Sequence, residues 1–375
     1  MKKIFFLLEN LGDDGGGSER VVVNLCNQLS KHNPNIYLLS LTNNKRFYKN
    51  IINKRVNVFL FPFTKSVYSI FYLYKFLNKN KPNIVFCTSF HLTIYAAILK
   101  ILLKNSFSLV SRISNNIDKY FNHHKSLKWN LIYFLYFYFI KDMDRIISPS
   151  KELINSLKKK IDKTQYKKII LIQNPIDLNY IINKSKLIDK KISTIKKNFF
   201  LSVGRLVLNK DYYTLIKAFK YFLTINKNFN NKYCLIIIGS GTLYEDLANL
   251  IKNENMHDKI ILLNGKNNPF PFIAKSKIFI LSSIYEGYPN VLLEAQALKK
   301  KIISTNCDFG PKEILQYGKY GFLVKTGDYK NLGLTMAKAL NTKNKTISSK
   351  NLKKVNSLEI ITSKYSDLFL NLNEK

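Results

Sequence analysis

IFILSSIYEGYPNVLLEAQAL, residues 278–298, contains the three parts of a strand–loop–helix unit in one stretch. The apolar run 278–281, followed by two serines, is typical of a buried strand in a parallel sheet. Turn-forming residues follow at 284–290, and an apolar helix is predicted from about Val291. In open α/β sheets, ligands bind outside the carboxyl ends of the strands. We therefore expect the loop between this strand and this helix to carry a site.

Two carboxylates, Glu286 and Glu294, flank the start of the predicted helix. Free N–H groups at a helix N-terminus attract anions, and carboxylates accept hydrogen bonds from vicinal hydroxyls. The pair therefore fits a ligand with hydroxyls at both ends and a phosphate between them, which is the shape of a nucleotide-sugar. A purely structural explanation remains open, because the helix dipole favours an early Glu and Gly-Tyr-Pro-Asn is ordinary turn chemistry.

The composition indicates an ordinary globular protein with a large positive charge. A chain of 375 residues suggests two domains. Its 60 Lys and Arg against 24 Asp and Glu give a formal net charge of +36. Part of this excess fits an AT-rich genome, since Lys, Asn and Ile are all abundant. Such a charge attracts nucleic acid, anionic membrane surfaces or phosphorylated substrates, and it does not choose among them.

The cysteines and the amino-terminal residues bear on the cellular compartment. The four cysteines are far apart in sequence, form no C-x-x-C pair and have apolar neighbours: Cys26, Cys87, Cys234 and Cys307. This pattern predicts reduced thiols in a cytosolic protein and argues against a zinc site. The start MKKIFFLL resembles a signal peptide for a few residues, but Glu9 and Asn10 interrupt the apolar run. We predict a first β-strand there instead.

The most apolar run in the chain is WNLIYFLYFYFI, residues 129–140. Its twelve residues fall short of the roughly 20 that a membrane-spanning helix needs. The aromatic content fits either a buried helix or a helix at a lipid interface. Of these two interpretations, we expect the buried helix.

Alternating strands and helices occur twice along the chain. The first series opens with the apolar run 3–8, a glycine loop at 12–17 and an amphipathic helix. The loop lacks the G-x-G-x-x-G order of a dinucleotide site; its glycines allow close approach of a ligand or of another domain, or make a tight turn. Further strands of the first series are expected at 36–41, 56–61, 84–88, 107–112, 145–148 and 168–173, and those of the second at 199–203, 233–238, 259–263, 278–282, 301–304 and 321–324.

This alternation predicts the α/β class, with two Rossmann-like domains that face each other across a cleft. Asn174-Pro175-Ile176-Asp177 and the Lys-rich stretch after it mark the domain boundary. We expect an N-terminal domain at 1–175, a linker at 176–197, a C-terminal domain at 198–354 and a closing helix within 355–375.

Further candidate residues follow other predicted strands. Arg205 and Lys210 come after the strand at 199–203, where two cations suit a diphosphate. Glycine turns follow the next strands at 239–241 and at Gly265, and the polar, Pro-rich loop 265–272 suits the edge of a base. Asp142-Met143-Asp144 matches a metal-binding D-x-D pattern, but it precedes a strand, so we interpret it as a charged helix end. The five histidines show no metal-ligand spacing.

Several of these motifs together carry a family resemblance. They are Gly16-Gly17-Ser18-Glu19-Arg20, Gly204-Arg205-Leu206 with Lys210, Gly239-Ser240-Gly241, Asn268-Pro269-Phe270-Pro271-Phe272, Glu286-x7-Glu294 and Gly310-Pro311-x-Glu313. The set resembles the family-four retaining glycosyltransferases of GT-B architecture with the E-x7-E signature. The match spans nearly the whole chain. It is similar in particular to bacterial enzymes of lipopolysaccharide, capsule or lipid-linked oligosaccharide synthesis.

The resemblance implies a role for each matching residue. Glu294 would bind the ribose hydroxyls of the donor, and Glu286 would face the transferred sugar. Arg205 and Lys210 would hold the diphosphate, so that Glu286, Arg205 and Lys210 form the expected catalytic set. The remaining expected donor-binding residues are Gly16, Gly17, Gly204, Gly239, Gly265, Gly287, Asn290 and Val291. The resemblance implies no cofactor and no metal, and a terminal helix that crosses back onto the N-terminal domain.

The sequence departs from the family in one place. Many relatives carry a histidine in an N-terminal loop near the acceptor, whereas the comparable residues 111–116 read SRISNN. The polar catalytic group of the N-terminal domain is therefore unassigned, and His91, which follows the strand at 84–88, is a weak candidate.

The leading hypothesis is a cytosolic, metal-independent glycosyltransferase that uses a UDP-sugar. Its acceptor would be a glycan, linked to a polyprenyl diphosphate and reached by docking on the anionic inner face of the cell membrane. The first alternative is a UDP-sugar 2-epimerase of the same architecture, which would act without an acceptor. The second is a basic nucleic-acid-binding protein, with steeply salt-dependent affinity; the sequence carries no recognition motif that supports it.

Overall fold

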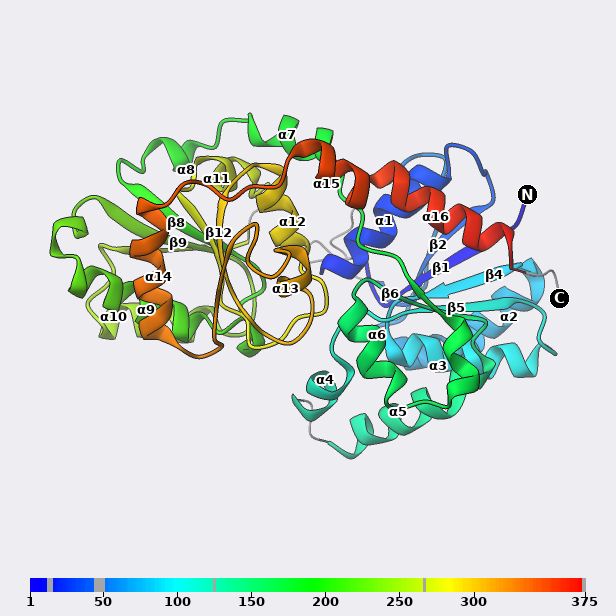
Figure 1. Ribbon diagram of the computed structural model, residues 1–375. Coiled ribbons are helices and arrows are strands. Elements are labelled where there is room, and N and C mark those ends of the chain that lie inside the picture. Colours follow the sequence, from blue (N-terminus) through cyan, green and yellow to red (C-terminus); the bar gives the residue numbers. More distant parts are fainter. Residues whose placement is uncertain (12–15, 44–50, 124–125, 266–267, 373–375) are drawn as a thin grey trace. The chain divides into compact units, whose positions relative to one another are not determined.

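The computed structural model describes residues 1–11, 16–43, 51–123, 126–265 and 268–372 (Figure 1). The chain forms two compact units. The first consists of residues 1–175 and 356–375, and the second of residues 176–355.

The first unit is built on a seven-stranded sheet in the order β3-β2-β1-β4-β5-β6-β7. All of its strand pairs are parallel. The order reverses between β1 and β4, as in a doubly wound fold. The strands are β1 (Ile4–Leu8), β2 (Ile36–Ser40), β3 (Asn57–Leu60), β4 (Ile84–Cys87), β5 (Ser108–Arg112), β6 (Arg145–Ser148) and β7 (Ile169–Leu171).

Helices cover both faces of this sheet, which is why its central strands are continuous apolar runs. Helices α1 (Gly17–Leu29) and α16 (Leu358–Leu370) pack together on one face. Helices α2 (Ile70–Asn80), α3 (Phe90–Leu102) and α5 (Leu127–Tyr138) lie on the other (Figure 1). The shorter elements are α4 (Ile117–His123), α6 (Lys151–Lys158), η1 (Ser66–Ser69), η2 (Phe139–Asp142) and η3 (Lys163–Lys168).

The closing helix α16 belongs to this first unit. The ring of Phe369 lies 6.1 Å from that of Phe6 in β1, and the ring of Tyr365 lies 5.9 Å from that of Phe86 in β4. The chain thus returns to its first sheet after completing the second unit.

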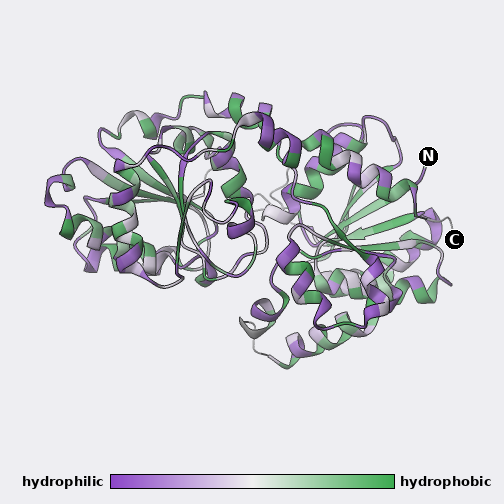
Figure 2. Cartoon of the chain, in the orientation of Figure 1, coloured by the Kyte–Doolittle hydropathy of each residue, from purple (hydrophilic) through white to green (hydrophobic). Residues whose placement is uncertain are grey.

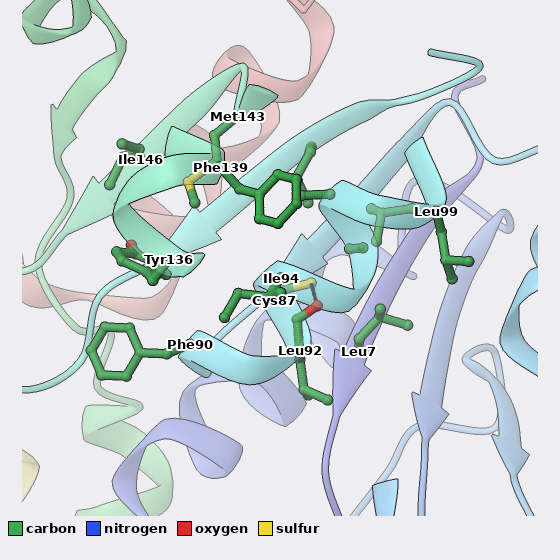
Figure 3. Close-up of a cluster of buried hydrophobic side chains, with 14 of the residues drawn as sticks. Leu7, Cys87, Phe90, Leu92, Ile94, Leu99, Tyr136, Phe139, Met143 and Ile146 are labelled. Atoms are coloured by element: carbon green, nitrogen blue, oxygen red, sulfur yellow. Dashed lines mark hydrogen bonds between the residues drawn. The ribbon is translucent and has the colours of Figure 1, made fainter. Parts of the chain in front are cut away.

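On the sheet face that α2, α3 and α5 cover, a cluster of buried side chains forms the core (Figure 3). Leu7 and Cys87 from the strands meet Phe90 and Leu92 of α3, and the Cys87 Sγ lies 3.6 Å from the carbonyl oxygen of Leu92. The ring of Tyr136 packs edge-on against Phe90, with centroids 4.9 Å apart. This contact attaches α5 to the core.

The prediction of a buried helix at 129–140 is wrong. Among the described side chains of α5, only Tyr136 is fully buried. Phe139 and Ile140 are buried, but they belong to η2. The helix packs against α3 and the core along one side and leaves its other side at the surface.

The second unit has a six-stranded, all-parallel sheet in the order β10-β9-β8-β11-β12-β13. Here the order reverses between β8 and β11. The strands are β8 (Asn198–Val203), β9 (Tyr233–Ile238), β10 (Ile260–Leu263), β11 (Ile278–Leu281), β12 (Lys301–Thr305) and β13 (Phe322–Val324).

Helices again cover both faces. One face carries α9 (Tyr212–Ile225), α10 (Tyr244–Asn253) and α14 (Tyr329–Asn341). The other carries α7 (Leu178–Ser185), α8 (Lys190–Ser193), α11 (Phe270–Lys275), α12 (Asn290–Ala297) and α15 (Ser349–Asn356). The remaining elements are α13 (Pro311–Ile314), η4 (Leu208–Lys210) and η5 (Lys227–Phe229). Residues 176–197, expected as a linker, thus include two helices that pack within this unit.

The predicted fold class, α/β with two Rossmann-like sheets, is confirmed. One local expectation is wrong. The second half of the Pro-rich loop 265–272 is helical, because α11 begins at Phe270 and buries Phe270 and Phe272 in the core. Asn268 begins this turn, since its Oδ1 accepts from the Phe270 N–H and its Nδ2 donates to the Lys184 carbonyl. Residues 266–267 lie outside the described residues.

Candidate functional site

The loops that follow β8 and β11 meet because these two strands are neighbours in the sheet. Strand β8 pairs with β9 on one side and with β11 on the other. The chain therefore leaves β8 and β11 at the point where the strand order reverses, which is where doubly wound sheets bind ligands. Arg205 and Lys210 lie on the first loop, and Glu286 lies on the second.

Lys210 and Glu286 form an ion pair across this point. The Lys210 Nζ lies 2.5 Å from the Glu286 Oε1, and the Ser283 hydroxyl donates to the same oxygen at 2.7 Å. Both charged side chains are largely buried, with exposed fractions of 15% for Lys210 and 9% for Glu286. The structure thus brings together one cation and one carboxylate of the expected catalytic set. Arg205, the third member, is exposed on the same loop as Lys210.

The backbone around Lys210 is tied to the neighbouring loop. The Ser282 hydroxyl donates to the Lys210 carbonyl at 2.7 Å, and the Ile284 N–H donates to the Asn209 carbonyl at 2.8 Å. Asp211 then adopts the left-handed conformation (φ 48°, ψ 51°), and its carboxylate caps α9 by accepting from the Thr214 N–H. These contacts fix the position from which the Lys210 side chain extends.

Glycines allow the strand ends to approach closely. A Cβ atom on Gly239 would lie 1.9 Å from the carbonyl oxygen of Gly204, so no larger residue fits without a shift of the backbone. A Cβ on Gly204 would lie 3.1 Å from the Tyr212 hydroxyl and 3.7 Å from the Lys210 Cε. Gly265 is less constrained, since its Cβ would lie 3.3 Å from the Ser240 Oγ. The expected donor-binding glycines after β8 and β9 are therefore packed against one another.

The loop before α12 is closed by a second close contact. Gly310 has a φ of 85°, and a Cβ there would lie 2.5 Å from the carbonyl oxygen of Gly287. Helix α12 begins at Asn290, followed by Val291, so the first N–H groups of the helix come directly after this loop. Glu294 lies one turn further along and is buried.

The electrostatics of the site centre on Glu286. Burial, followed by the charge of Glu286, raises the pKa of the Cys307 thiol to about 12. Burial and Glu286 also raise the pKa of Tyr285, while Arg205 lowers it. The pKa of Tyr285 therefore depends on the charges of both Glu286 and Arg205. The Glu286 carboxylate itself is largely shielded from water.

The first unit holds the remaining candidates. Gly16 caps α1 and Gly17 is its first residue, so their expected role beside a diphosphate stays a prediction. The His91 Nε2 lies 3.5 Å from the Glu9 Oε2. Burial lowers the pKa of His91, Glu9 partly opposes this shift, and Lys128 adds to it.

Sequence reasoning missed several residues that hold this arrangement. Ser283 and Asn209 contact the loops of Lys210 and Glu286, and only the spacing of Ser283, three residues before Glu286, could have suggested its bond to the carboxylate.

In the first unit, Arg112 is buried at the end of β5, where its guanidinium donates to the Asn174 Oδ1 at 2.5 Å. No sequence pattern singled out this arginine.

Comparison with protein families matches both halves of the chain. The model "Glycosyl transferases group 1" matches residues 183–355, and the model "Glycosyltransferase Family 4" matches residues 15–180. An uncharacterized glycosyltransferase of Methanocaldococcus jannaschii is 30% identical over 300 residues, which are 72% of this chain and 70% of that protein. This chain belongs to the glycosyltransferases.

Two further comparisons extend over nearly the whole glycosyltransferase. A protein of Campylobacter jejuni is 25% identical over 353 residues, 92% of this chain and 90% of its own length. Its name describes an alpha-1,4-N-acetyl-D-galactosaminyltransferase acting on a GalNAc-GalNAc-diNAcBac-PP-undecaprenol. The crystal structure of Anabaena HepE in complex with UDP-glucose is similar with a TM-score of 0.80 at 14% identity, over 99% of this chain and 100% of that one, which shows the shared fold.

Within the described residues, none of the helices combines the length and the apolar character that a membrane-spanning segment requires.

Proposed function

We propose that this glycosyltransferase is a retaining enzyme that moves a hexose or N-acetylhexosamine from a UDP-sugar to a lipid-linked glycan acceptor. The observation that carries the proposal is the Lys210–Glu286 ion pair at the reversal point of the second sheet. It is followed by Glu294 on the helix that starts at the same loop. A cation and two carboxylates at a helix N-terminus match the phosphate and hydroxyl groups of a nucleotide-sugar.

In this proposal the donor lies along the loops after β8 and β11. Arg205 and Lys210 bind the diphosphate, helped by the N–H groups at Asn290 and Val291. A lysine ammonium has three donors, so Lys210 retains donors for a phosphate oxygen besides its bond to Glu286. Glu294 accepts hydrogen bonds from the ribose hydroxyls, and the remaining acceptor capacity of Glu286 faces a hydroxyl of the sugar. The glycines at 204, 239, 265 and 287 keep side chains out of the path of the donor.

Chemistry then depends on the leaving group. The bond between the sugar C1 and the diphosphate oxygen breaks through an oxocarbenium-like transition state. The acceptor hydroxyl adds to the same face of the sugar, and its proton passes to the departing diphosphate. The negative charge that develops on the diphosphate is stabilised by Arg205, Lys210 and the helix N-terminus. Because these fixed cations neutralise the charge, we expect transfer to continue in EDTA.

The acceptor is inferred from the relatives. The Campylobacter jejuni protein acts, by its name, on a glycan carried by PP-undecaprenol. We propose an acceptor of the same class, a glycan on a polyprenyl diphosphate, in the synthesis of a cell-surface polysaccharide. Such an acceptor lies in a membrane, so the enzyme would work at the cytoplasmic membrane surface.

A binding and transfer experiment tests the proposal. Calorimetry with a panel of UDP-, GDP- and ADP-sugars should identify a UDP-sugar, which is then assayed for transfer to polyprenyl-diphosphate-linked glycans. Arg205→Ala should lower turnover and Glu294→Ala should raise the dissociation constant of the donor. Indifference of the protein to every nucleotide-sugar would refute the proposal, and so would normal transfer by both variants. Conversion of the UDP-sugar to its 2-epimer without an acceptor would support the epimerase instead.

A further inference from the structure

Helix α5 turns an apolar ridge away from the protein. Its exposed large apolar side chains are Leu127, Leu131, Phe134 and Tyr138, with exposed fractions of 87%, 56%, 64% and 52%. Their spacing of four, three and four residues places them within a sector of roughly 60° around the helix. A surface helix of a globular protein normally carries polar residues on this side. An apolar outer ridge of this kind indicates a binding surface.

The opposite side of α5 is also apolar, so neither side of this helix is the polar one expected at a surface. Tyr136 is buried in the core, and Trp129, Ile132 and Tyr133 pack partly buried against it. Rotating the helix would therefore expose these side chains in place of the ridge. The ridge is a feature of the sequence that the fold of this unit does not use.

The neighbouring helices continue this apolar surface. Helix α3 packs alongside α5, and the last turns of α3 expose Ile98, Ile101 and Leu102. Element η1 lies next to α3, since Ser66 of η1 and His91 of α3 both contact the Glu9 carboxylate. The outer side of η1 and α2 exposes Val67, Tyr68, Phe71 and Tyr72. Green hydrophobic segments alternate with purple ones along these helices in Figure 2. We call the exposed apolar residues of α2, α3 and α5, with those of η1, the α2–α3–α5 face.

The charges on this face are all positive. The sequence contains no Asp or Glu between Glu19 and Asp118, and none in α5. Exposed lysines accompany the aromatic rings: the Lys141 Nζ lies 4.4 Å from the ring centroid of Tyr138, and the Lys75 Nζ lies 4.4 Å from that of Phe71. These are cation–π contacts, and lysines beside exposed aromatic residues are typical of helices that bind at membrane interfaces.

We propose that the α2–α3–α5 face docks on an anionic lipid bilayer, with the α5 ridge buried at the level of the headgroups. Apolar ridge residues gain free energy in the acyl boundary, and the lysines gain it from the negative surface potential. A second copy of this chain fits poorly, because the lysines of one copy would meet those of the other, and η1, α2, α3 and α5 themselves carry no acidic residue. Nucleic acid would use the lysines but leave the aliphatic ridge exposed. This docking rests on the proposed function in one respect: it would bring the enzyme to its lipid-linked acceptor.

Vesicle flotation of the full chain tests the ridge. The wild-type protein should float with vesicles of equimolar phosphatidylglycerol and phosphatidylcholine. Leu131→Gln/Phe134→Gln should lower the partition coefficient about tenfold or more, because two large apolar side chains no longer gain from burial. The matched control is Ile225→Gln/Leu334→Gln, which changes two exposed apolar residues on helices of the second unit and should bind like the wild type. Equal binding by the ridge variant and the wild type would overturn the proposal.

A second pair of variants tests the charge. Lys128→Gln/Lys141→Gln should weaken binding to the anionic vesicles, while Lys330→Gln/Lys338→Gln on α14 should not. Light scattering tests a second copy of the chain as the occupant: a wild-type dimer that the ridge variant makes monomeric would also overturn the proposal. All four variants should keep the wild-type melting temperature. The vesicle result stands whether or not a UDP-sugar binds, since calorimetry measures donor affinity separately.

Discussion

The Nζ of Lys210 lies 2.5 Å from the Oε1 of Glu286, and the two residues are 76 positions apart in the chain. They come from the loops after β8 and β11, the two strands at the reversal point of the second sheet. Both side chains are largely buried, so bulk salt screens this pair less than a surface pair. Removal of either residue would therefore leave the charge of the other largely buried without a counter-ion.

Replacing Lys210 should affect both catalysis and stability. Lys210→Met removes a cation from the departing diphosphate and should lower kcat by about 10²–10³. It also leaves the Glu286 carboxylate buried beside Ser283 without its counter-ion, which should cost about 1–3 kcal/mol of unfolding free energy. Steady-state kinetics and urea unfolding measure the two effects.

The control for this variant is Lys220→Met. The Lys220 Nζ lies 2.6 Å from the Glu254 Oε2, but this pair is on the surface, with side chains 50% and 32% exposed. Surface pairs contribute little, so turnover and stability should stay near those of the wild type. If Lys210→Met behaves like Lys220→Met, the ion pair has no part in the reaction.

Glu294 should determine donor affinity without changing turnover as strongly. Glu294→Gln keeps the shape of this buried residue of α12 but removes the charge that strengthens hydrogen bonds from hydroxyls. The dissociation constant of the UDP-sugar should rise about 10–100-fold by calorimetry. Glu245→Gln, on α10 of the same unit, should leave it unchanged. A wild-type dissociation constant for Glu294→Gln would show that Glu294 does not bind the donor.

The sequence predicts the sheets well because their strands are buried on both faces. Short continuous apolar runs such as 278–281 and 233–238, which alternate with helices, are typical of buried strands in a parallel sheet. Parallel sheets also place all the strand ends at one edge, so the proximity of Lys210 and Glu286 follows from the order of the strands. Their direct ion pair does not follow, since it depends on side-chain directions and on the Ser282–Lys210 contact.

The two failures have different causes. In α5 both sides are apolar, so periodicity cannot indicate which side faces the core, and apolar content alone predicts burial. In the stretch 268–275 two prolines suggest a loop, but one follows the Asn268 turn and the other lies in the first turn of α11, where the missing N–H costs nothing. In both segments the composition does not determine the structure; the contacts with neighbouring elements decide which side of α5 is buried and where α11 begins.

Gly239→Ala should destabilise the second unit. The new Cβ would lie 1.9 Å from the carbonyl oxygen of Gly204, and the clash is with backbone rather than with a flexible side chain. The ends of β8 and β9 must separate, which should lower the unfolding free energy by about 1–3 kcal/mol and weaken donor binding. Gly265→Ala, whose Cβ would lie no closer than 3.3 Å to any atom, the Ser240 Oγ being the nearest, should be nearly neutral in stability. Equal urea midpoints for the two variants would contradict this account of the glycines.

The four cysteines should be unreactive in the folded protein. All four are free and buried. Burial raises the pKa of the Cys234 thiol to about 11 and, together with the charge of Glu286, that of Cys307 to about 12. A thiol with a raised pKa is almost entirely protonated at pH 8, and only the thiolate reacts. Ellman's reagent at pH 8 should therefore detect no fast thiol in the native state and four in denaturant. A fast-reacting thiol in the native protein would show that one of these sites opens readily.

Acid should destabilise the first unit through His91. Burial lowers its pKa from 6.5, Glu9 partly opposes this, and Lys128 adds to it, while the ring of Tyr95 packs edge-on beside it. The unfolded chain therefore takes up a proton at about pH 6.5, where the folded chain does not. The contribution of His91 to the unfolding free energy is complete above this pH and is lost as the pH falls toward the lower pKa of the folded state.

Urea unfolding between about pH 5 and pH 8 should show a shallower decline of the unfolding free energy for His91→Asn than for the wild type. His257→Asn, at an exposed position, should keep the wild-type slope. Parallel curves for His91→Asn and the wild type would mean that other groups cause the acid sensitivity.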